Sequence, residues 1–150
     1  MQRSPLVTVR RVGWNEAATT LRAIRKAVFV DEQKVPEELE WDGIDPQCLH
    51  VLAASPSGEA VGTGRLLPDG HIGRMAVLKH WRGTGVGSAL LAELISAARE
   101  QQYSAVELSA QTHALGFYRR HGFAVEGGEY LEAGIAHRMM RLALVKPPPG

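Results

Sequence analysis

The sequence predicts an α/β protein in which helices flank a mixed β-sheet. Short apolar runs of strand length alternate with segments whose apolar residues recur at helical spacing. Taken in order, these segments are a strand, a helix, three strands, a helix, a strand, a helix and two strands. Strands and helices that alternate in this way pack as layers, with helices on a sheet. The chain has 150 residues, so we expect a single domain, 1–150, with a proper core.

Composition excludes several classes of function. The formal net charge is +1, and basic and acidic residues are scattered along the chain, which argues against nucleic acid as a partner. No apolar stretch approaches the roughly 18 residues of a membrane span, and the N-terminus lacks the apolar core of a secretory signal. Cys48 is the single cysteine, so no internal disulfide is expected and a cytoplasmic location is the default. The histidines lack metal-ligand spacing, so we expect no metal.

The chain opens with a predicted strand over 5–12 and a helix over 16–29, with Asn15 as its N-cap. Apolar residues recur on one face of this helix, and the basic residues Arg22, Arg25 and Lys26 are expected to point away from that face.

An acidic, turn-rich passage follows over 31–46, with a short helical turn expected at 37–40. Its length and its carboxylates fit a functional loop better than a plain connection. Carboxylates attract cations, so we expect this passage to border the pocket of a cationic substrate. A solvated acidic loop is the plainer alternative for most of its carboxylates, which are Glu32, Glu37, Glu38, Glu40, Asp42 and Asp45.

The remaining elements are read from apolar runs and turn residues. They are a hairpin of strands 49–54 and 59–67, a central strand 72–78, a helix that runs to residue 100, a strand 105–110, a short helix 112–121 closed by Gly122, and strands 123–126 and 137–144, before a frayed tail at 146–150.

The chain is organised around the basic, glycine-rich turn over 82–87, which lies between the central strand and the long helix. A helix that begins directly from such a turn presents unpaired backbone N–H groups and the positive end of its dipole. Glycines let an anion approach this backbone closely. The turn is therefore predicted to bind a phosphate group.

Three ligands compete for this turn. A Walker-type nucleotide site requires a Gly-Lys-Ser/Thr ending, whereas this turn ends Gly85-Val86-Gly87-Ser88 without a lysine. A dinucleotide fingerprint shares Gly83-x-Gly85 and the later acidic Glu107, but its final spacing is broken and it lies mid-chain. The third pattern is Arg-x-x-Gly-x-Gly, formed by Arg82, Gly85 and Gly87, which resembles the pyrophosphate-binding turn of the GNAT superfamily of acyl-CoA-dependent N-acyltransferases.

The resemblance to this superfamily extends over roughly residues 7–143. The segment 117–123, FYRRHGF, looks like the family's FY-x-x-x-GF segment. The pieces VFV-x-EQ at 28–33, GRL at 64–66, AQT at 110–112 and AGI-x-H at 133–137 resemble a branch of small single-domain bacterial GNAT proteins. The resemblance implies a GNAT-type sheet that is mixed and mostly antiparallel.

The resemblance also implies how coenzyme A binds. It places the thioester beside the central strand and the pyrophosphate in the glycine-rich turn. The implied cofactor-binding residues are Met75, Ala76, Val77, Arg82, Gly83, Thr84, Gly85, Val86, Gly87 and Phe117. The co-substrate is acetyl-CoA, without a metal.

Acyl transfer to an amine requires a proton acceptor for the amine and a proton donor for the leaving thiolate. Tyr118 is the general acid implied by its chemistry and by the resemblance, and the alternative is an aromatic side chain packed between helix and sheet. For the base, Glu32 is a candidate, and the sequence does not choose between it and Glu40, Asp42, His113, Glu132 and His137. Arg65 and Arg74 are either substrate-facing or exposed.

The sequence therefore predicts an N-acetyltransferase that transfers an acetyl group from acetyl-CoA to a primary amine by direct attack. One alternative is a non-catalytic acyl-CoA-binding or sensing module, and another is a dinucleotide-dependent enzyme. The expected partner is a small-molecule or peptide amine, without nucleic acid or membrane, and a homodimer stays open. The sequence does not identify the acceptor amine.

Overall fold

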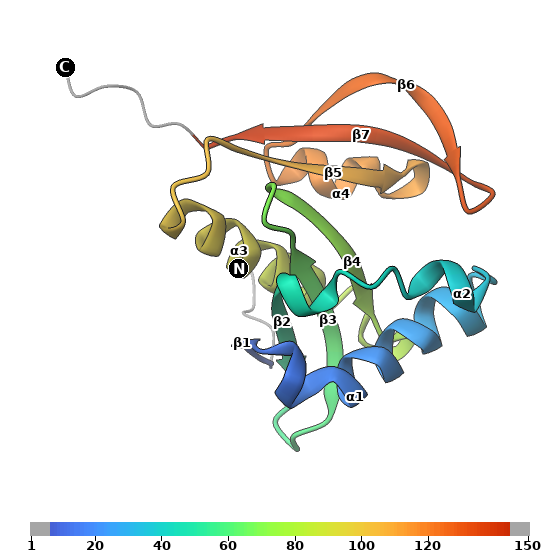
Figure 1. The fold of residues 1–150 in the computed structure, drawn as a ribbon, viewed down its shortest axis with the longest axis vertical. Helices are drawn as coiled ribbons and strands as arrows, with labels where there is room; N and C mark the ends of the chain where they lie inside the picture. The colour runs from blue at the N-terminus through green and yellow to red at the C-terminus, as the bar shows by residue number, and fades with distance from the viewer. Residues whose placement is uncertain (1–6, 145–150) are drawn as a thin grey trace.

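The computed structural model describes residues 7–144, which form one seven-stranded sheet of order β1-β2-β3-β4-β5-β7-β6 (Figure 1). Every neighbouring pair is antiparallel except β4 and β5, which are parallel. The mixed, mostly antiparallel sheet expected from the sequence is confirmed. Its strands are β1 (Thr8–Val12), β2 (Leu49–Ala54), β3 (Ala60–Leu66), β4 (His71–Val77), β5 (Ala105–Gln111), β6 (Ala124–Glu132) and β7 (Ile135–Ala143).

The sheet divides between β4 and β5. These strands pair only where His71 lies opposite Glu107 and Ile72 lies opposite Leu108. Beyond Ile72 they diverge, so that β5, β7 and β6 separate from the first four strands (Figure 1). Beyond Ile72, the backbone N–H and C=O groups on the facing edges of β4 and β5 therefore do not bond to one another in a continuous β-ladder.

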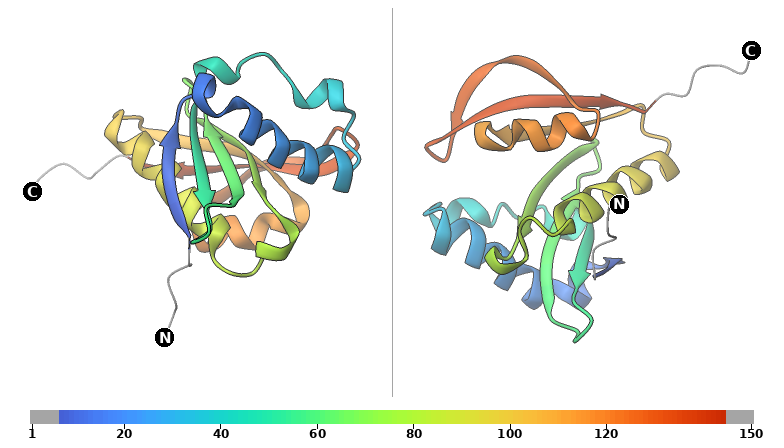
Figure 2. Two further views of the ribbon diagram at one scale, coloured as in Figure 1. Left: turned by 90° about the horizontal axis from the view of Figure 1, so that it is seen from below. Right: turned by 180° about the vertical axis from the view of Figure 1, so that it is seen from behind.

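Helices cover both faces of the first four strands (Figure 2). Helix α3 (Val86–Glu100) packs in one apolar cluster with Val51 and Ala53, whereas α1 (Trp14–Arg25) packs in another with Leu52. Successive strand residues point to opposite faces, which is why β2 supplies both clusters. Helix α3 lies close to β3, since a Cβ atom at Gly62 would stand 2.9 Å from Leu90 Cδ1.

The first helix differs from its predicted form over 16–29. It begins at Trp14, with Gly13 rather than Asn15 as its N-cap, because the Glu16 carboxylate accepts a hydrogen bond from the Gly13 N–H at 2.8 Å. After Arg25 the chain continues as a π-helix, η1 (Lys26–Glu32). The prediction that Arg25 points away was also wrong, because this side chain is only 1% exposed.

The other elements lie close to their predicted bounds. The turn over 37–40 is α2 (Glu37–Glu40), followed by the 3₁₀ turn η2 (Asp45–Gln47), and a further 3₁₀ turn, η3 (Lys79–Trp81), precedes the glycine-rich turn. The short helix divides into η4 (Thr112–Ala114) and α4 (Leu115–Arg120).

The sixth strand is longer than predicted. It runs from Ala124 to Glu132, and its register shifts between Glu126 and Tyr130, where Gly127 and Gly128 interrupt the apolar pattern. The predicted tail 146–150 and the first two residues of the predicted strand 5–12 lie outside the described residues.

Candidate active site

A β-bulge in β4 begins the site. Thr63 pairs with Ala76 and Arg65 pairs with Gly73, so that Arg74 and Met75 of β4 together face Gly64 of β3. Such a bulge leaves its extra residue unpaired and redirects the neighbouring side chains. Arg74 has a φ of 50°, a left-handed conformation that non-glycine residues rarely adopt. The strained backbone of β4 therefore lies at the point where β4 leaves β5.

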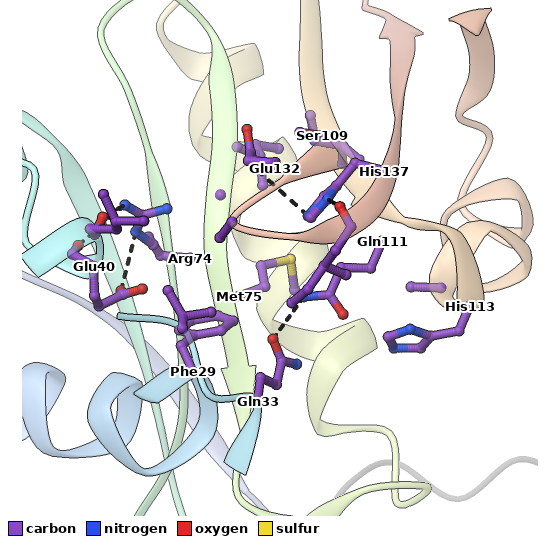
Figure 3. A pocket seen from close by; sticks show the side chains of 18 of the residues that line it. Phe29, Gln33, Glu40, Arg74, Met75, Ser109, Gln111, His113, Glu132 and His137 are labelled. Carbon is purple, nitrogen blue, oxygen red and sulfur yellow. Dashed lines mark hydrogen bonds and ion pairs between the residues drawn. The ribbon is translucent and has the colours of Figure 1, made fainter. Parts of the chain in front are cut away.

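A cavity of about 620 Å³ fills the space between the diverging strands (Figure 3). Met75 and Arg74 of β4 line one side, and Ser109 and Gln111 of β5 line the other. The π-helix and the β6–β7 hairpin complete the wall. A pocket of this size, with polar side chains from several elements, is a typical small-molecule site.

Tyr118 extends from α4 into this cavity. Its hydroxyl lies 3.8 Å from Met75 Sδ. Burial raises the pKa of Tyr118 to about 12, so the phenol stays protonated at neutral pH. It is therefore a proton donor within reach of the bulged strand.

The glycine-rich turn has the geometry of an anion site. Gly83 and Gly85 have φ values of 76° and 94°, and Gly85 is the N-cap of the long helix α3. The N–H groups of the first turn of α3 have no partners within the helix. Thr84 donates its hydroxyl to the Trp81 carbonyl at 2.6 Å, which fixes the turn. The residues present therefore fit a bound pyrophosphate.

The turn and the cavity meet at α4. A Cβ atom at Gly87 would stand 3.4 Å from Phe117 Cζ, so the first turn of α3 lies next to the aromatic ring that precedes Tyr118. Val77, the last residue of β4, also approaches Gly87, with its Cγ2 atom 3.9 Å from the same Cβ position. A ligand that spans the turn and the cavity would run along Gly87 and Phe117.

Two other residues that were predicted to bind the cofactor have buried side chains. Ala76 is 3% exposed and Val86 is 1% exposed.

Arg82 and Glu32 form an ion pair through both carboxylate oxygens, with Arg82 Nη2 at 2.7 Å from Glu32 Oε1. Arg82 Nε also donates to the Val77 carbonyl at 3.0 Å. The hydrogen bond from Arg82 lowers the pKa of Glu32. Glu32 therefore contacts the glycine-rich turn and does not line the cavity.

Glu132 and His137 face the cavity from the β6–β7 hairpin (Figure 3). His137 Nε2 lies 3.6 Å from Glu132 Oε2, and His137 Nδ1 lies 2.6 Å from the Ile135 carbonyl. The carbonyl can only accept, so it fixes a proton on Nδ1 and leaves Nε2 to exchange protons. The His137 side chain is 8% exposed and that of Glu132 is 55% exposed, so the pair connects the cavity to solvent. His113 also lines the cavity.

Six charged side chains form a closed ring of alternating sign beside the cavity. The ion-pair ring consists, in order, of Arg25, Glu40, Arg74, Asp42, Arg65 and Asp45, and each residue is within 3.3 Å of the next, Asp45 closing on Arg25. Burial is an opposing influence on the pKa of Asp42, but the Arg65 guanidinium outweighs it and lowers that pKa to about 2.

The ring gives the acidic passage a structural role in addition to the predicted one. Glu40 and Asp42 do line the cavity, as expected for residues that border an acceptor pocket. Their charges are matched by arginines from α1, β3 and β4, and Glu40 and Asp45 are 2% and 4% exposed. The ion pairs of the ring fix the acidic passage to the sheet. The helical pattern predicted that Arg25 points away from the apolar face. Periodicity within one helix cannot reveal ion-pair partners that lie farther along the chain.

Sequence reasoning missed Gln33 and Ser109 as lining residues. Gln111 Nε2 donates to Gln33 Oε1 at 2.8 Å, across the cavity wall from β5 to the end of η1. Gln33 directly follows Glu32, but no feature of its own type distinguishes it from a surface glutamine. These side chains line one cavity because β4 and β5 diverge in the folded chain.

Membrane spanning and metal binding find no support among the described residues. None of the helices between residues 7 and 144 has the length and apolar content needed to cross a bilayer. Within the same residues, no three histidine, cysteine or acidic side chains gather as ligands for a metal ion would.

Comparison with known proteins identifies the family. The model of the GNAT acetyltransferase domain matches residues 15–144. The uncharacterized N-acetyltransferase YjcF of Bacillus subtilis is 39% identical over 121 residues, which are 78% of this chain and 86% of YjcF. The solved structure of an acyl-CoA N-acyltransferase from Pseudomonas aeruginosa is 34% identical, with a TM-score of 0.77 over 93% of this chain and 100% of that one.

Escherichia coli ElaA has a similar structure, with 29% identity and a TM-score of 0.80 over 90% of this chain and 99% of ElaA. The chain belongs to the GNAT family of acetyltransferases, and the match extends over most of its length. The dinucleotide alternative was wrong, because a dinucleotide-binding fold requires a parallel, doubly wound sheet, whereas five of the six strand pairs within residues 7–144 are antiparallel.

Proposed function

We propose that the protein transfers the acetyl group of acetyl-CoA to a primary amine by direct attack of the amine on the thioester. The observation that carries this proposal is the proximity of Gly87 and Phe117, which links the glycine-rich turn to the cavity that holds Tyr118. A molecule with a pyrophosphate at one end and a reactive thioester at the other matches this layout. Acetyl-CoA has that form.

In the proposed reaction a nitrogen–carbon bond forms and the carbon–sulfur bond breaks. The amine loses a proton, the thiolate gains one from Tyr118, and the Tyr118 phenolate regains a proton from water after the thiol leaves. The raised pKa of Tyr118 does not prevent this step, because the burial that disfavours the phenolate also disfavours the thiolate. Donors on the bulged strand near Met75 would stabilise the oxyanion.

His137 is the base we propose, with Glu132 as the route by which the proton leaves. His137 faces the cavity and has its Nδ1 proton fixed, so its Nε2 atom can accept a proton from the amine. The half-exposed Glu132 carboxylate is next to it and can pass that proton to water. Glu32 is a poorer base, because Arg82 binds both its oxygens.

The test is thiol release from acetyl-CoA across a broad panel of amines, with products confirmed by mass. We expect amine-dependent CoA release and a mass gain of one acetyl group on the amine. A His137→Gln variant should lose most turnover, while His80→Gln, a change at an exposed residue of η3, should retain it. Tight binding of acetyl-CoA without turnover on any amine would instead indicate a non-catalytic acyl-CoA-binding module.

A further inference from the structure

Two nitrogens of the Arg74 guanidinium, Nε and Nη1, form no hydrogen bond among the described residues. Its Nε lies 3.1 Å from Glu40 Oε2, and its Nη2 lies 3.3 Å from Asp42 Oδ2 and 3.2 Å from the Glu40 carbonyl. Among residues 7–144, no hydrogen bond is formed by Nη1. The side chain lines the cavity and is 26% exposed (Figure 3). The ion-pair ring thus holds the Arg74 guanidinium in place, with Nε buried and Nη1 left as an accessible donor.

The carboxylates beside Arg74 are poorly suited to bind a cationic substrate. The ring contains three arginines and three acids, so its formal charge is zero. Asp42 and Glu40 each lie between two guanidinium groups. A substrate ammonium at this wall would therefore be close to Arg74 without a free carboxylate to bind it, which is unfavourable.

A second donor, Gln33, lines the same cavity. Gln33 accepts a hydrogen bond at Oε1 from Gln111, so its own amide N–H groups are unused among the described residues. Gln33 is on the same side of the strand divergence as Arg74, at the end of η1, which contacts β4. Both side chains line the cavity. This side of the cavity therefore offers hydrogen-bond donors and a positive charge.

The other side offers the opposite chemistry. Glu132 and His137 belong to β6 and β7, which lie beyond β5 in the sheet. Figure 3 shows them apart from Arg74 and Glu40. An amine near this pair can lose its proton, whereas an anionic group is better placed near Arg74. The cavity is polarised from one half of the sheet to the other.

We propose that the acceptor is a small amino acid, an amine that also carries a carboxylate, and that Arg74 binds this carboxylate. The inference rests on the proposed function and specifies its acceptor. The carboxylate accepts hydrogen bonds from Arg74 Nη1 and Gln33 Nε2, while the amine is directed toward Met75 and the Glu132–His137 pair. A hydrogen bond to a charged group contributes about 1.5–3 kcal/mol, which is roughly ten- to a hundredfold in selectivity.

The experiment measures kcat/KM for amino acids and for their primary amides, in which the carboxylate is neutral. The set includes α-amino acids and longer ω-amino acids, so that the separation of amine and carboxylate is varied. In the parent protein we expect the amino acid to exceed its amide by about tenfold or more. Arg74→Lys keeps the positive charge of the ring but removes the guanidinium fork, and should reduce this ratio to about threefold or less.

The matched control is Arg99→Gln, at an exposed position on α3, which should preserve the parent ratio. A ratio near one in the parent, or an equal ratio in Arg74→Lys, would overturn the proposal. If no amine is turned over at all, the proposed function fails separately. Calorimetry with the same amino acids and amides then decides whether Arg74 binds the carboxylate. If Arg74→Lys weakens the binding of the amino acid, the carboxylate site is supported. If the substitution leaves this affinity unchanged, the carboxylate site is refuted.

Discussion

Arg82 binds both carboxylate oxygens of Glu32, so the arginine expected to contact a pyrophosphate is already paired with the end of the π-helix. A bound pyrophosphate would compete with Glu32 for this guanidinium. The two side chains are 40% and 38% exposed. An exposed ion pair contributes at most about 1 kcal/mol, so the competition is modest in energy.

Glu32→Gln should therefore increase the affinity for coenzyme A by about two- to fivefold, because Arg82 loses its competing anion. Its kcat should stay within about threefold of the parent, since Glu32 does not line the cavity. Calorimetry and steady-state kinetics measure the two quantities, with the exposed Glu38→Gln as control. Weaker binding would mean that Glu32 positions Arg82, and a kcat loss of about a hundredfold would restore Glu32 as the base.

Gly85→Glu should lower the affinity for coenzyme A at least tenfold, or about 1.4 kcal/mol. The substitution introduces bulk and negative charge where the first turn of α3 presents its N–H groups. It also places a side chain at a φ of 94°, which is strained in itself.

Gly58→Glu separates these effects. Gly58 has a φ of 90° in the β2–β3 turn, with nothing within 4 Å of its Cβ position. It should incur a similar backbone strain without a loss of affinity. If both variants bind coenzyme A as the parent does, the glycine-rich turn is not the pyrophosphate site.

Acid should destabilise the protein through the ion-pair ring. Asp42 has a folded-state pKa of about 2, below its model-compound value of 3.8. A group whose pKa is depressed on folding contributes stability above its unfolded-state pKa, and this stability is lost as pH falls toward the folded-state pKa. The loss should therefore occur between about pH 4 and pH 2. Burial opposes the shift in the pKa of Asp45 as well, but Arg25 and Arg65 lower it, so both acids act in the same direction.

Asp42→Asn should be less stable than the parent at neutral pH, and the difference should shrink as pH falls through this range. Urea unfolding midpoints at a series of pH values measure it. Asp31→Asn provides the control, because the Asp31 side chain is 60% exposed and its ion pair with Lys26 spans 3.4 Å. A stability difference between Asp42→Asn and the parent that is constant with pH would mean that the Asp42 charge does not contribute.

Local patterns predicted the architecture because its elements depend on local chemistry. The glycine-rich turn and the amphipathic helix after it are visible in the sequence between Arg82 and Glu100, and the family resemblance orders the strands around them. The cavity is not local. Its lining includes residues from both halves of a sheet that separates after Ile72, and no periodicity in β4 reveals that separation.

The ion-pair ring could not be predicted either, because its residues are also far apart in the sequence. The acidic residues of the passage were visible, but their partners come from α1, β3 and β4. A buried arginine such as Arg25 looks like a surface residue until the chain is folded, because its burial depends on two acids 15 and 20 residues farther on. The π-helix after Arg25 was missed for a related reason, since a widened turn leaves almost no mark on the apolar repeat.

The last prediction concerns Tyr118. Tyr118→Phe keeps the aromatic ring against Phe117 and Phe123, with which Tyr118 makes edge contacts, so stability should change little. Loss of the proposed general acid should lower kcat by roughly 10²–10⁴-fold. Affinity for coenzyme A should hardly change, because the proposed phosphate contacts are in the glycine-rich turn.

An activated aryl thioester tests the role of the hydroxyl directly. Its leaving thiolate is stable without protonation, so Tyr118→Phe should recover much of its turnover with this donor, whereas a variant damaged in folding or binding should not. Tyr103→Phe is the matched control, since Tyr103 packs beyond the cavity at the end of α3 and should be indifferent to the donor. If Tyr118→Phe uses acetyl-CoA as fast as the parent does, Tyr118 is a packing residue, and the thiolate takes its proton from water or from another side chain.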